Sequence, residues 1–487
     1  MFSLCLCDFV VKTSSDWMSG MRVSGVQNVQ NVQNVQNVQN VQNVQNVQNV
    51  QNVQNVQNVQ NQLALILDWA KLCMLKNGEG NIMKWVKFDD SMKIPVKSWC
   101  EAVEPGALKQ AVNLAAHPAT FHHIALMPDC HVGYGMPIGG VIACEDAVIP
   151  NAVGVDIGCG MVAVETNVPA EIFADMSKRR EVMAAVKSLV PAGEGVSHRS
   201  PAEWDGFEQY LKSLKGEKHP QWPSALDCCN LGTLGGGNHF IEMQKDEAGM
   251  IWLMIHSGSR NLGYRIAGFY HEQAKKLNQQ SRIELPDSDL AFLPVTSEAG
   301  HNYIRDMNFV LSYALENRRR MMRSFKQALA DAAGKVEFRQ EVNIHHNYAS
   351  SEEHFGRKIW VHRKGATSAG AGETGIIPGS MGTSSYIVRG LGNPESFMSC
   401  SHGAGRKMGR NEACRNLSVT ECDKAMSGIA FDRWSKFRSK WKKNGDKGLL
   451  DLGEAPLAYK DIDEVIKAQL DLIEPIVKLS PLAVVKG

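Results

Sequence analysis

Five short polar segments, four of them containing glycine, lie far apart in the chain and carry side chains that could bind a metal ion or act as a nucleophile. They are VGVDIGCGM around Asp156 and Cys159, GGGNHFIE around His239, HSGSR at His256, HHN at residues 345–347, and SHGAGR around His402. Glycine lets the backbone turn sharply and come close to a bound ligand. The set therefore predicts an enzyme that assembles a metal and phosphate site from distant parts of its sequence.

One carboxylate, one thiolate and three imidazoles make up a candidate metal centre. The donors are Asp156, Cys159, His239, His256 and His346. Five donors exceed what one tetrahedral ion uses, and a thiolate can bridge two ions, so a binuclear site that shares Cys159 would suit phosphoryl displacement. The soft thiolate favours Zn²⁺ or Co²⁺ at least as much as Mn²⁺. Any one of these side chains alone is more often structural, so the prediction depends on the set.

A second possible chemistry is nucleophilic. His402 lies between small residues, and a neutral imidazole can attack phosphorus to form a covalent intermediate. The nearby segment PGSMGTSS, residues 378–385, offers backbone N–H groups and hydroxyls that suit phosphate oxygens. The alternative interpretation of this segment is that its glycines only form turns.

Composition indicates a globular protein with a large core, because 44% of its 487 residues are hydrophobic and 21% are charged. The net charge of +1 gives no overall attraction to polyanions, so nucleic-acid binding would need local basic patches. Twelve cysteines without a CxxC pair favour a reduced protein. No segment approaches the roughly 18 apolar residues of a membrane span, and we expect a cytoplasmic protein.

The N-terminal segment differs from the rest. Residues 26–61 repeat the triplet Val-Gln-Asn twelve times, a period that gives valine no continuous buried face in a helix or a strand. Such a tract has little to bury against the entropy of ordering. We predict a disordered, dispensable extension over residues 1–82, with Met83 as an alternative start, and one catalytic domain over residues 83–487. A repetitive interaction stalk is the alternative.

The remaining sequence mixes short strands with fewer helices. FHHIALMPDC and GGVIACEDAVIP predict strands, VGVDIGCGMVAVET predicts a strand interrupted at its chemistry, and MIWLMIHSGSR predicts a buried strand that ends at His256. Apolar residues at helical intervals predict a helix from Met307 to Lys335. This irregular alternation favours an α+β fold over a doubly wound parallel sheet.

The order of these motifs resembles that of the RtcB family of RNA-splicing ligases. VGVDIGCGM, LGTLGGGNHFIE, HSGSR, HHNY, PGSMG, SHGAGR, AYKDID and VVKG follow one another as in that family, and the likeness covers nearly all of residues 83–487. It implies a GTP-dependent enzyme with two Mn²⁺ ions that joins an RNA 3′-phosphate or 2′,3′-cyclic phosphate to a 5′-hydroxyl. It also implies an α+β domain with central β-sheets surrounded by helices, and tRNA halves or broken RNA ends as substrates. For metal identity we follow the resemblance.

The resemblance assigns a role to each motif residue. It implies that Asp156, Cys159 and His239 bind one ion, that Cys159, His256 and His346 bind the other, and that His402 is the guanylylated nucleophile. The residues it implies for GTP contact are Asn238, His239, Phe240, Ile241, Glu242, His346, Asn347, Pro378, Gly379, Ser380, Met381, Ser385, His402, Gly403, Ala404, Gly405, Tyr459 and Lys486.

Local positive charge for RNA gathers at residues 431–447, which hold seven Lys/Arg against two Asp. Trp434, Phe437 and Trp441 are spaced as an aromatic face on a helix, which could stack bases or be a core contact with a solvated basic back. The basic run Arg318–Arg320 is typical of an exposed helix surface.

Other enzyme classes and a non-enzymatic role fit the sequence less well. A binuclear metallohydrolase would use the same metal donors without GTP or His402. GAGETG at residues 370–375 matches the GxGxxG of nucleotide-binding oxidoreductases but leads into GIIPGSMG rather than a helix. A lysine-adenylating ligase would need a KxDG motif, which the sequence lacks. An interaction protein built on the triplet repeat would leave the polar segments unexplained.

Overall fold

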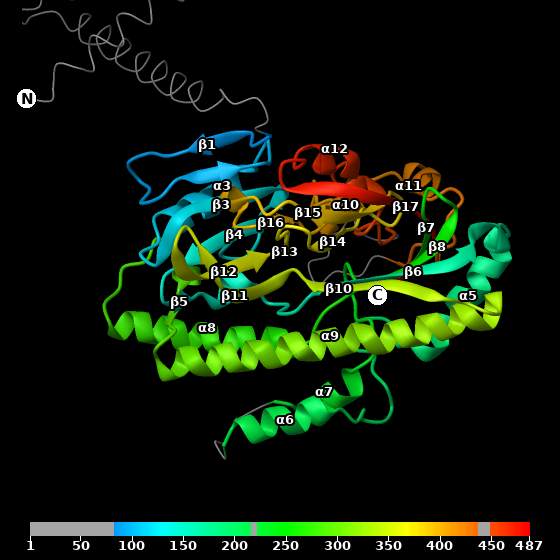
Figure 1. Ribbon diagram of the computed structural model, residues 1–487, viewed down its shortest axis with the longest axis horizontal. Coiled ribbons are helices and arrows are strands. Elements are labelled where there is room, and N and C mark those ends of the chain that lie inside the picture. Colours follow the sequence, from blue (N-terminus) through cyan, green and yellow to red (C-terminus); the bar gives the residue numbers. More distant parts are fainter. Residues whose placement is uncertain (1–81, 216–221, 437–448) are drawn as a thin grey trace, which may run out of the picture. The chain divides into compact units, whose positions relative to one another are not determined.

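The computed structural model describes residues 82–215, 222–436 and 449–487, all of which belong to the unit Met74–Gly487. The predicted extension over residues 1–82 lies outside the described residues, apart from Ile82. The described residues form an α+β fold, as predicted, in which helices pack against β-sheets (Figure 1).

A six-stranded sheet holds the N-terminal part of this unit. Its order is β1 (Trp85–Lys87), β2 (Val96–Ser98), β3 (Thr120–His131), β4 (Ile138–Cys144), β12 (Arg357–Lys364) and β11 (Asn347–His354). Only β2 and β3 pair in parallel, and helix α3 (Pro105–Ala115) connects them. The predicted strand FHHIALMPDC is confirmed as the central part of β3.

A seven-stranded antiparallel sheet carries most of the predicted metal ligands. Its order is β10 (Phe338–His345), β6 (Gly160–Pro169), β8 (Met250–Ser257), β7 (Phe240–Lys245), β17 (Ile473–Lys486), β15 (Ser385–Gly390) and β14 (Thr374–Ile377). Two further pairs are β13 (Ala366–Ser368) with β16 (Ser399–Ser401) and β5 (Ala147–Val148) with β9 (Leu293–Pro294).

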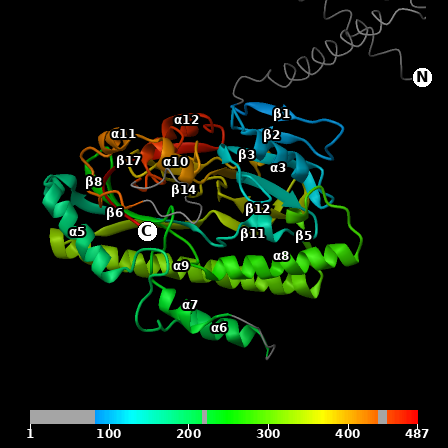
Figure 2. The same ribbon diagram turned by 180° about the vertical axis from the view of Figure 1, so that it is seen from behind.

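Helices pack on the outside of the sheets. The remaining α-helices are α4 (Pro150–Val153), α5 (Met176–Leu189), α6 (Asp205–Ser213), α7 (Ala225–Asn230), α8 (Leu262–Gln280), α9 (Glu298–Ala333), α10 (Arg410–Asn416), α11 (Val419–Ala425) and α12 (Ile462–Lys467). The 3₁₀ turns are η3 (Ala170–Phe173), η4 (Ser288–Leu290), η5 (Pro394–Ser396) and η6 (Pro456–Ala458). Seen from either side, α8 and α9 run along one side of the sheets, and α10, α11 and α12 lie on the other (Figures 1 and 2).

The largest core joins the seven-stranded sheet to α5 and α9. Val162 and Ile255 from the sheet pack with Val186 of α5 and Phe325 of α9, and all four are fully buried. Each such side chain contributes about 1.5–3 kcal/mol by leaving water. This core holds α9 beneath the strand ends that carry the polar motifs.

The predicted helix at 307–335 is part of the longer α9, which begins at Glu298. Ser297 caps its start, because its Oγ accepts a hydrogen bond from the Gly300 N–H at 3.0 Å. The cap and the apolar Tyr303 extend the helical pattern toward the N-terminus, where the sequence prediction had left it out.

Two local predictions need correction. The strand expected through VGVDIGCGMVAVET starts only at Gly160, because α4 and a tight turn occupy residues 150–159. The aromatic helix expected over residues 431–447 is wrong for its described part: residues 431–435 are non-helical and Lys436 forms an isolated bridge to Leu450. Phe437 and Trp441 lie outside the described residues.

The GxGxxG match at residues 370–375 leads from β13 into β14 rather than into a helix, which removes the context that a dinucleotide site needs. Among the helices of the described ranges, none is long and apolar enough to cross a membrane.

Candidate active site

Five adjacent strands of the seven-stranded sheet bring the polar motifs together at one end of the strands. Gly160 at the start of β6 pairs with His345 at the end of β10 and with Ser257 at the end of β8. Phe240 at the start of β7 pairs with His256 and with Lys486 near the end of β17. Since the strands are antiparallel, these starts and ends must meet, and the neighbouring loop residues meet with them.

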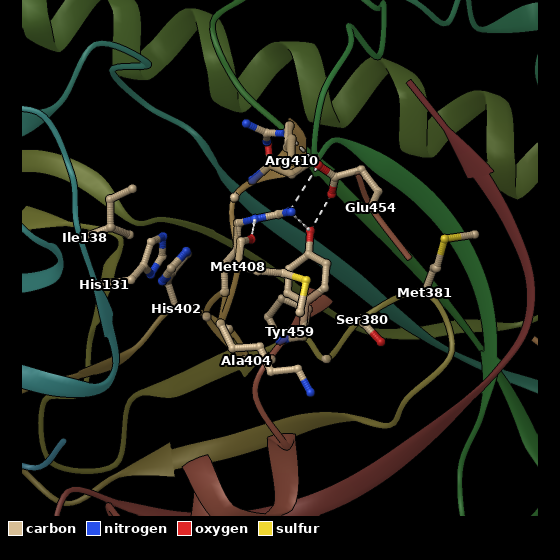
Figure 3. A pocket seen from close by; sticks show the side chains of 18 of the residues that line it. His131, Ile138, Ser380, Met381, His402, Ala404, Met408, Arg410, Glu454 and Tyr459 are labelled. Atoms are coloured by element: carbon tan, nitrogen blue, oxygen red, sulfur yellow. Dashed lines mark hydrogen bonds and ion pairs between the residues drawn. The ribbon is translucent and has the colours of Figure 1, made fainter. Parts of the chain in front are cut away.

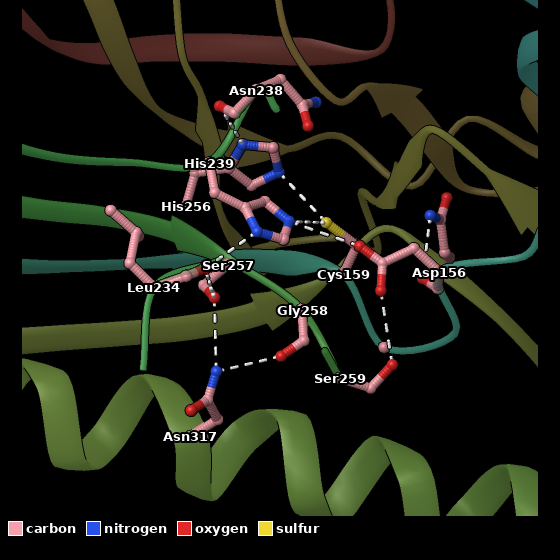
Figure 4. A network of polar contacts seen from close by, with 12 residues as sticks. Asp156, Cys159, Leu234, Asn238, His239, His256, Ser257, Gly258, Ser259 and Asn317 are labelled. Carbon is pink, nitrogen blue, oxygen red and sulfur yellow. Dashed lines mark hydrogen bonds and ion pairs between the residues drawn. The ribbon is translucent and has the colours of Figure 1, made fainter. Parts of the chain in front are cut away.

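The five predicted metal donors converge here, and Figure 4 shows four of them, Asp156, Cys159, His239 and His256. The Cys159 Sγ lies 3.2 Å from the His256 Nε2 and 3.5 Å from the His239 Nε2. The Nε2 atoms of His256 and His346 are 3.3 Å apart, and the Asp156 Oδ2 lies 3.3 Å from the His239 Nε2. The thiol and the three imidazoles are buried, and a group of Cys159, His239 and His256 has the spacing to hold a metal ion.

Backbone carbonyls fix the orientation of two imidazoles. The His239 Nδ1 is 2.9 Å from the Leu234 carbonyl and the His256 Nδ1 is 3.3 Å from the Asn238 carbonyl, so Nδ1 donates and Nε2 presents its lone pair to the cluster. Burial, together with the neighbouring His239, holds the pKa of His256 well below its usual value. Burial and the neighbouring His402 do the same to the pKa of His346. Neutral imidazole is the form that binds a metal ion.

The turn that carries two of the donors is packed against α9. Gly158 has φ of 78°, a conformation that favours glycine, and a Cβ there would lie 2.9 Å from the Ala314 side chain. Gly158 is therefore required both by the turn and by the close approach of the helix.

The helix also supplies hydrogen bonds that the sequence prediction missed. Asn317, fully buried, accepts from the Gly232 N–H at 2.7 Å and donates to the Gly258 carbonyl at 3.0 Å. Arg318 donates through Nη1 to the Gly158 carbonyl at 2.8 Å and to the Ser257 carbonyl at 3.0 Å. These two side chains tie together the loops that carry Cys159, His239 and His256.

The prediction that Arg318 is exposed helix surface is wrong, because its side chain is fully buried. Burial lowers the pKa of its guanidinium only to about 10, so it stays charged at neutral pH. Burial and the Asp156 carboxylate raise the pKa of the Cys159 thiol well above its usual value, whereas Arg318 lowers it. The guanidinium therefore favours the thiolate that a metal ion requires.

Replacing Arg318 with glutamine is expected to lower metal affinity about 10- to 100-fold, the usual effect of losing a group that orients metal ligands. Competition titration of Mn²⁺ and of Zn²⁺ against a fluorescent chelator measures the change. The matched control is Arg319→Gln on the same helix, whose side chain is 58% exposed. Equal affinities in the two variants would show that Arg318 does not support the metal ligands.

His402 lies beside the donor cluster, with its ring centroid 4.9 Å from that of His346. Its Nδ1 is 2.6 Å from the Oδ2 of Asp129, which also accepts from the His402 backbone N–H at 3.1 Å. Asp129 is fully buried at the end of β3. A carboxylate in this position keeps the proton on Nδ1 and leaves Nε2 as a nucleophile. The sequence prediction did not select Asp129, although it directly follows the strand pattern FHHIALMP.

A cavity of 420 Å³ opens next to His402 (Figure 3); we name it the catalytic cavity. Of the predicted nucleotide contacts, those that line it are Asn238, Phe240, Pro378, Gly379, Ser380, Met381, His402, Gly403, Ala404, Gly405, Tyr459 and Lys486. Those that do not line it are His239, Ile241, Glu242, His346, Asn347 and Ser385. His239 and His346 belong to the donor cluster, and Glu242 is buried.

A buried acid on the cavity wall, Glu454, was also missed by the sequence prediction. Its Oε1 lies 2.7 Å from the Arg410 Nε and 3.3 Å from the Arg406 Nη1, and its Oε2 accepts from the Tyr459 hydroxyl and lies 3.5 Å from the Lys486 Nζ. Burial would raise the pKa of Glu454, but Lys486, Arg410 and Arg406 lower it to about 2. The carboxylate thus fixes three cations and a phenol on one wall.

Glu242 is one of the residues predicted to contact GTP. Burial raises the pKa of its carboxyl to about 7, against the lowering influence of Lys486 and the hydrogen bond from Gln244 at 2.7 Å. The Gln244 amide also donates to the Ser385 Oγ at 3.1 Å. Glu242 and Ser385 therefore share one hydrogen-bond partner, Gln244, and neither lines the catalytic cavity.

The raised pKa of Glu242 gives stability a definite pH dependence. Between about pH 4.5 and 7, the Glu242 carboxyl keeps its proton in the folded protein but has lost it in the unfolded chain. The free energy of unfolding therefore falls as pH rises through that window and is constant above it. Glu242→Gln has no carboxyl to titrate. We therefore expect its free energy of unfolding, relative to that of wild type, to rise by up to about 3 kcal/mol between pH 4 and pH 8. Urea unfolding across this range measures it, with the exposed Glu247→Gln as control. A pH-independent difference would contradict the raised pKa.

The fold and this arrangement place a group of side chains that could hold a metal ion, and a histidine paired with a buried carboxylate, beside one cavity. A family model described as "tRNA-splicing ligase RtcB" matches residues 110–487. The chain is 41% identical over 414 residues to the RNA-splicing ligase RtcB of Escherichia coli strain K12, which covers 81% of this chain and 97% of that protein. It is 31% identical over 474 residues to the tRNA-splicing ligase RtcB of Pyrobaculum aerophilum, covering 81% of this chain and 95% of that protein.

An RNA-splicing ligase RtcB of Mycobacterium bovis is 31% identical over 447 residues, covering 78% of this chain and all of that protein. The chain belongs to the RtcB family of RNA ligases, as its motif order predicted, and family membership supports RNA ligation as its activity.

Proposed function

We propose that this protein uses GTP and Mn²⁺ to join RNA 3′-phosphate or 2′,3′-cyclic phosphate ends to 5′-hydroxyl ends, with GMP carried on His402. The observation that supports this most is the position of His402, whose Nδ1 lies 2.6 Å from the buried Asp129 while its ring borders both the donor cluster and the catalytic cavity. A metallohydrolase would need the donor cluster but not this histidine.

In the proposed reaction, the His402 Nε2 attacks the α-phosphorus of GTP, which forms a nitrogen–phosphorus bond and releases pyrophosphate. A cyclic RNA end is first opened by water to a 3′-phosphate. An oxygen of that phosphate then displaces His402 from the α-phosphorus, and the RNA 5′-hydroxyl finally attacks the 3′-phosphorus and releases GMP. Asp129 holds the proton on Nδ1 and stabilises the imidazole as its charge changes.

The donor cluster fits a binuclear metal centre, because one thiolate, one carboxylate and three imidazoles turn toward a common space. Bound ions would neutralise phosphate charge and orient the phosphates. We propose Mn²⁺ on the strength of the family, although thiolate and imidazole ligands suit Zn²⁺ and Co²⁺ equally well.

We further propose the cytoplasm as its compartment, and tRNA splicing or RNA repair as its role. We also propose that residues 83–487 form the catalytic domain and that residues 1–82 are dispensable for ligation. An inactive chain beginning at Met83, compared with an active full chain, would contradict this last point.

Incubation with GTP labelled at the α-phosphate, in the presence of Mn²⁺, tests the proposal directly. A covalent label that survives a denaturing gel, together with joining of an RNA 3′-phosphate to a 5′-hydroxyl strand, is the expected result. Cleavage of phosphodiesters without protein labelling would instead favour the metallohydrolase. Parallel reactions with Zn²⁺ and Co²⁺ decide the metal.

A further inference from the structure

A second cavity adjoins the catalytic cavity. Its volume is 300 Å³, and we name it the side cavity. The two cavities share four lining residues, Met381, Arg410, Glu454 and Lys486, of which the first three are labelled in Figure 3. Because one wall separates them, a group in the side cavity lies next to whatever occupies the catalytic cavity.

The far wall of the side cavity is aromatic. Phe431 and Trp434 both line it, are half-buried, and have ring centroids 5.1 Å apart with planes tilted by 55°. The Trp434 Nε1 donates to the Asp423 Oδ1 at 2.8 Å, which fixes the indole in place. A fixed ring beside a cavity is a surface on which a planar base can stack.

Among the described residues that line the side cavity, Arg433 is a cation that carries no ion pair. Asp432 is paired with Lys187 at 2.9 Å, and Glu454 is paired with Arg410. Arg433 lines the cavity and is exposed, and within the described part of the chain no hydrogen bond or ion pair engages it. An arginine in this state suits a phosphate.

Two backbone contacts border the side cavity. Lys436 bridges Leu450, and the Asp451 N–H donates to the carbonyl of Ser435 at 2.8 Å; Ser435 and Asp451 both line the cavity. Residues 437–448, which contain five Lys/Arg and one Asp, lie outside the described residues.

We propose that the side cavity binds a nucleobase of the single-stranded RNA substrate, stacked on Trp434 with its phosphate at Arg433. This inference rests on the proposed ligase function and adds a binding subsite for RNA. GTP is a less suitable occupant, because most of its predicted contacts, Tyr459 among them, line the catalytic cavity and not the side cavity.

The test separates RNA binding from guanylylation. For Trp434→Ala we expect the KM for a short RNA with a 3′-phosphate to rise about tenfold, within the usual loss for one stacked base, and the rate of labelling by α-labelled GTP to stay unchanged. Trp434→Phe keeps a ring and is expected to recover most of the affinity. Melting temperatures show whether Trp434→Ala remains folded, and Trp434→Phe and Arg433→Gln still test the site if it does not.

Arg433→Gln is expected to weaken RNA binding, measured by fluorescence polarisation without GTP, and to lower its salt slope by about one. The matched control is Arg357→Gln, an exposed arginine of β12 that lines neither cavity. Unchanged RNA binding in the Trp434 and Arg433 variants would overturn the proposal. So would an equal loss of guanylylation, which would place GTP in the side cavity. Failure of the ligase function itself would appear differently, as wild-type protein that binds RNA but takes no label.

Discussion

Replacing His402 with alanine is expected to abolish covalent labelling by α-labelled GTP and, with it, RNA ligation. The proposed reaction has one protein nucleophile, and no other imidazole of the described residues combines a place on the catalytic cavity with a hydrogen bond to a buried carboxylate. Metal content should stay at the wild-type level, because His402 is not among the five donors that converge on Cys159. Autoradiography of a denaturing gel and elemental analysis give the two readings.

The control for this experiment is His301→Ala, which removes an exposed imidazole on α9 and should leave labelling unchanged. Label retained in His402→Ala would exclude His402 as the nucleophile. A joint loss of label and metal would instead place His402 within the metal centre.

The sequence was sufficient to predict the set of candidate metal donors that the fold brings together. Asp156, Cys159 and His256 lie in glycine-rich segments at strand ends, where such side chains tend to serve a site rather than a core. Their convergence could be predicted only as a set, because the register of five antiparallel strands, and not any local pattern, decides which ends meet.

The residues that position this chemistry could not be predicted, because their roles come from contacts across the fold. Arg318 belongs to a run of three arginines that is typical of a helix surface, yet it donates to carbonyls of two segments that carry candidate metal donors. Likewise, the residues that flank Asn317 and Glu454 in the sequence form no motif that would indicate their roles. Asp129 lies 273 positions from its partner His402, and only the packing of β3 against the loop after β16 brings them together.

Glu242 shows a different limit. Its motif predicted nucleotide contact, but in the structure its carboxylate accepts a hydrogen bond from Gln244, whose amide also bonds Ser385, and neither Glu242 nor Ser385 lines the catalytic cavity. The pH dependence of Glu242 therefore also reports on the solvation of these three side chains.

Replacing Asp129 with asparagine is expected to slow His402 guanylylation by about 10³- to 10⁴-fold, the scale seen when the carboxylate that orients a catalytic histidine becomes an amide. The Asp129 Oδ2 accepts from both the ring Nδ1 and the backbone N–H of His402. An amide nitrogen in that position would donate to Nδ1, which would move the ring proton to Nε2 and remove the nucleophilic lone pair. An amide oxygen would keep the tautomer but lose the charge that stabilises the imidazolium.

Single-turnover labelling with α-labelled GTP measures the rate, and GTP affinity and metal content should change little, because Asp129 lies behind the histidine. The matched control is Asp471→Asn, which removes a half-buried carboxylate that accepts from the Trp99 indole and lines neither cavity. If Asp129→Asn labelled as fast as Asp471→Asn, the buried pair would be a structural contact. The identity of the ring nitrogen that bonds phosphorus would then have to be decided by the metal centre rather than by Asp129.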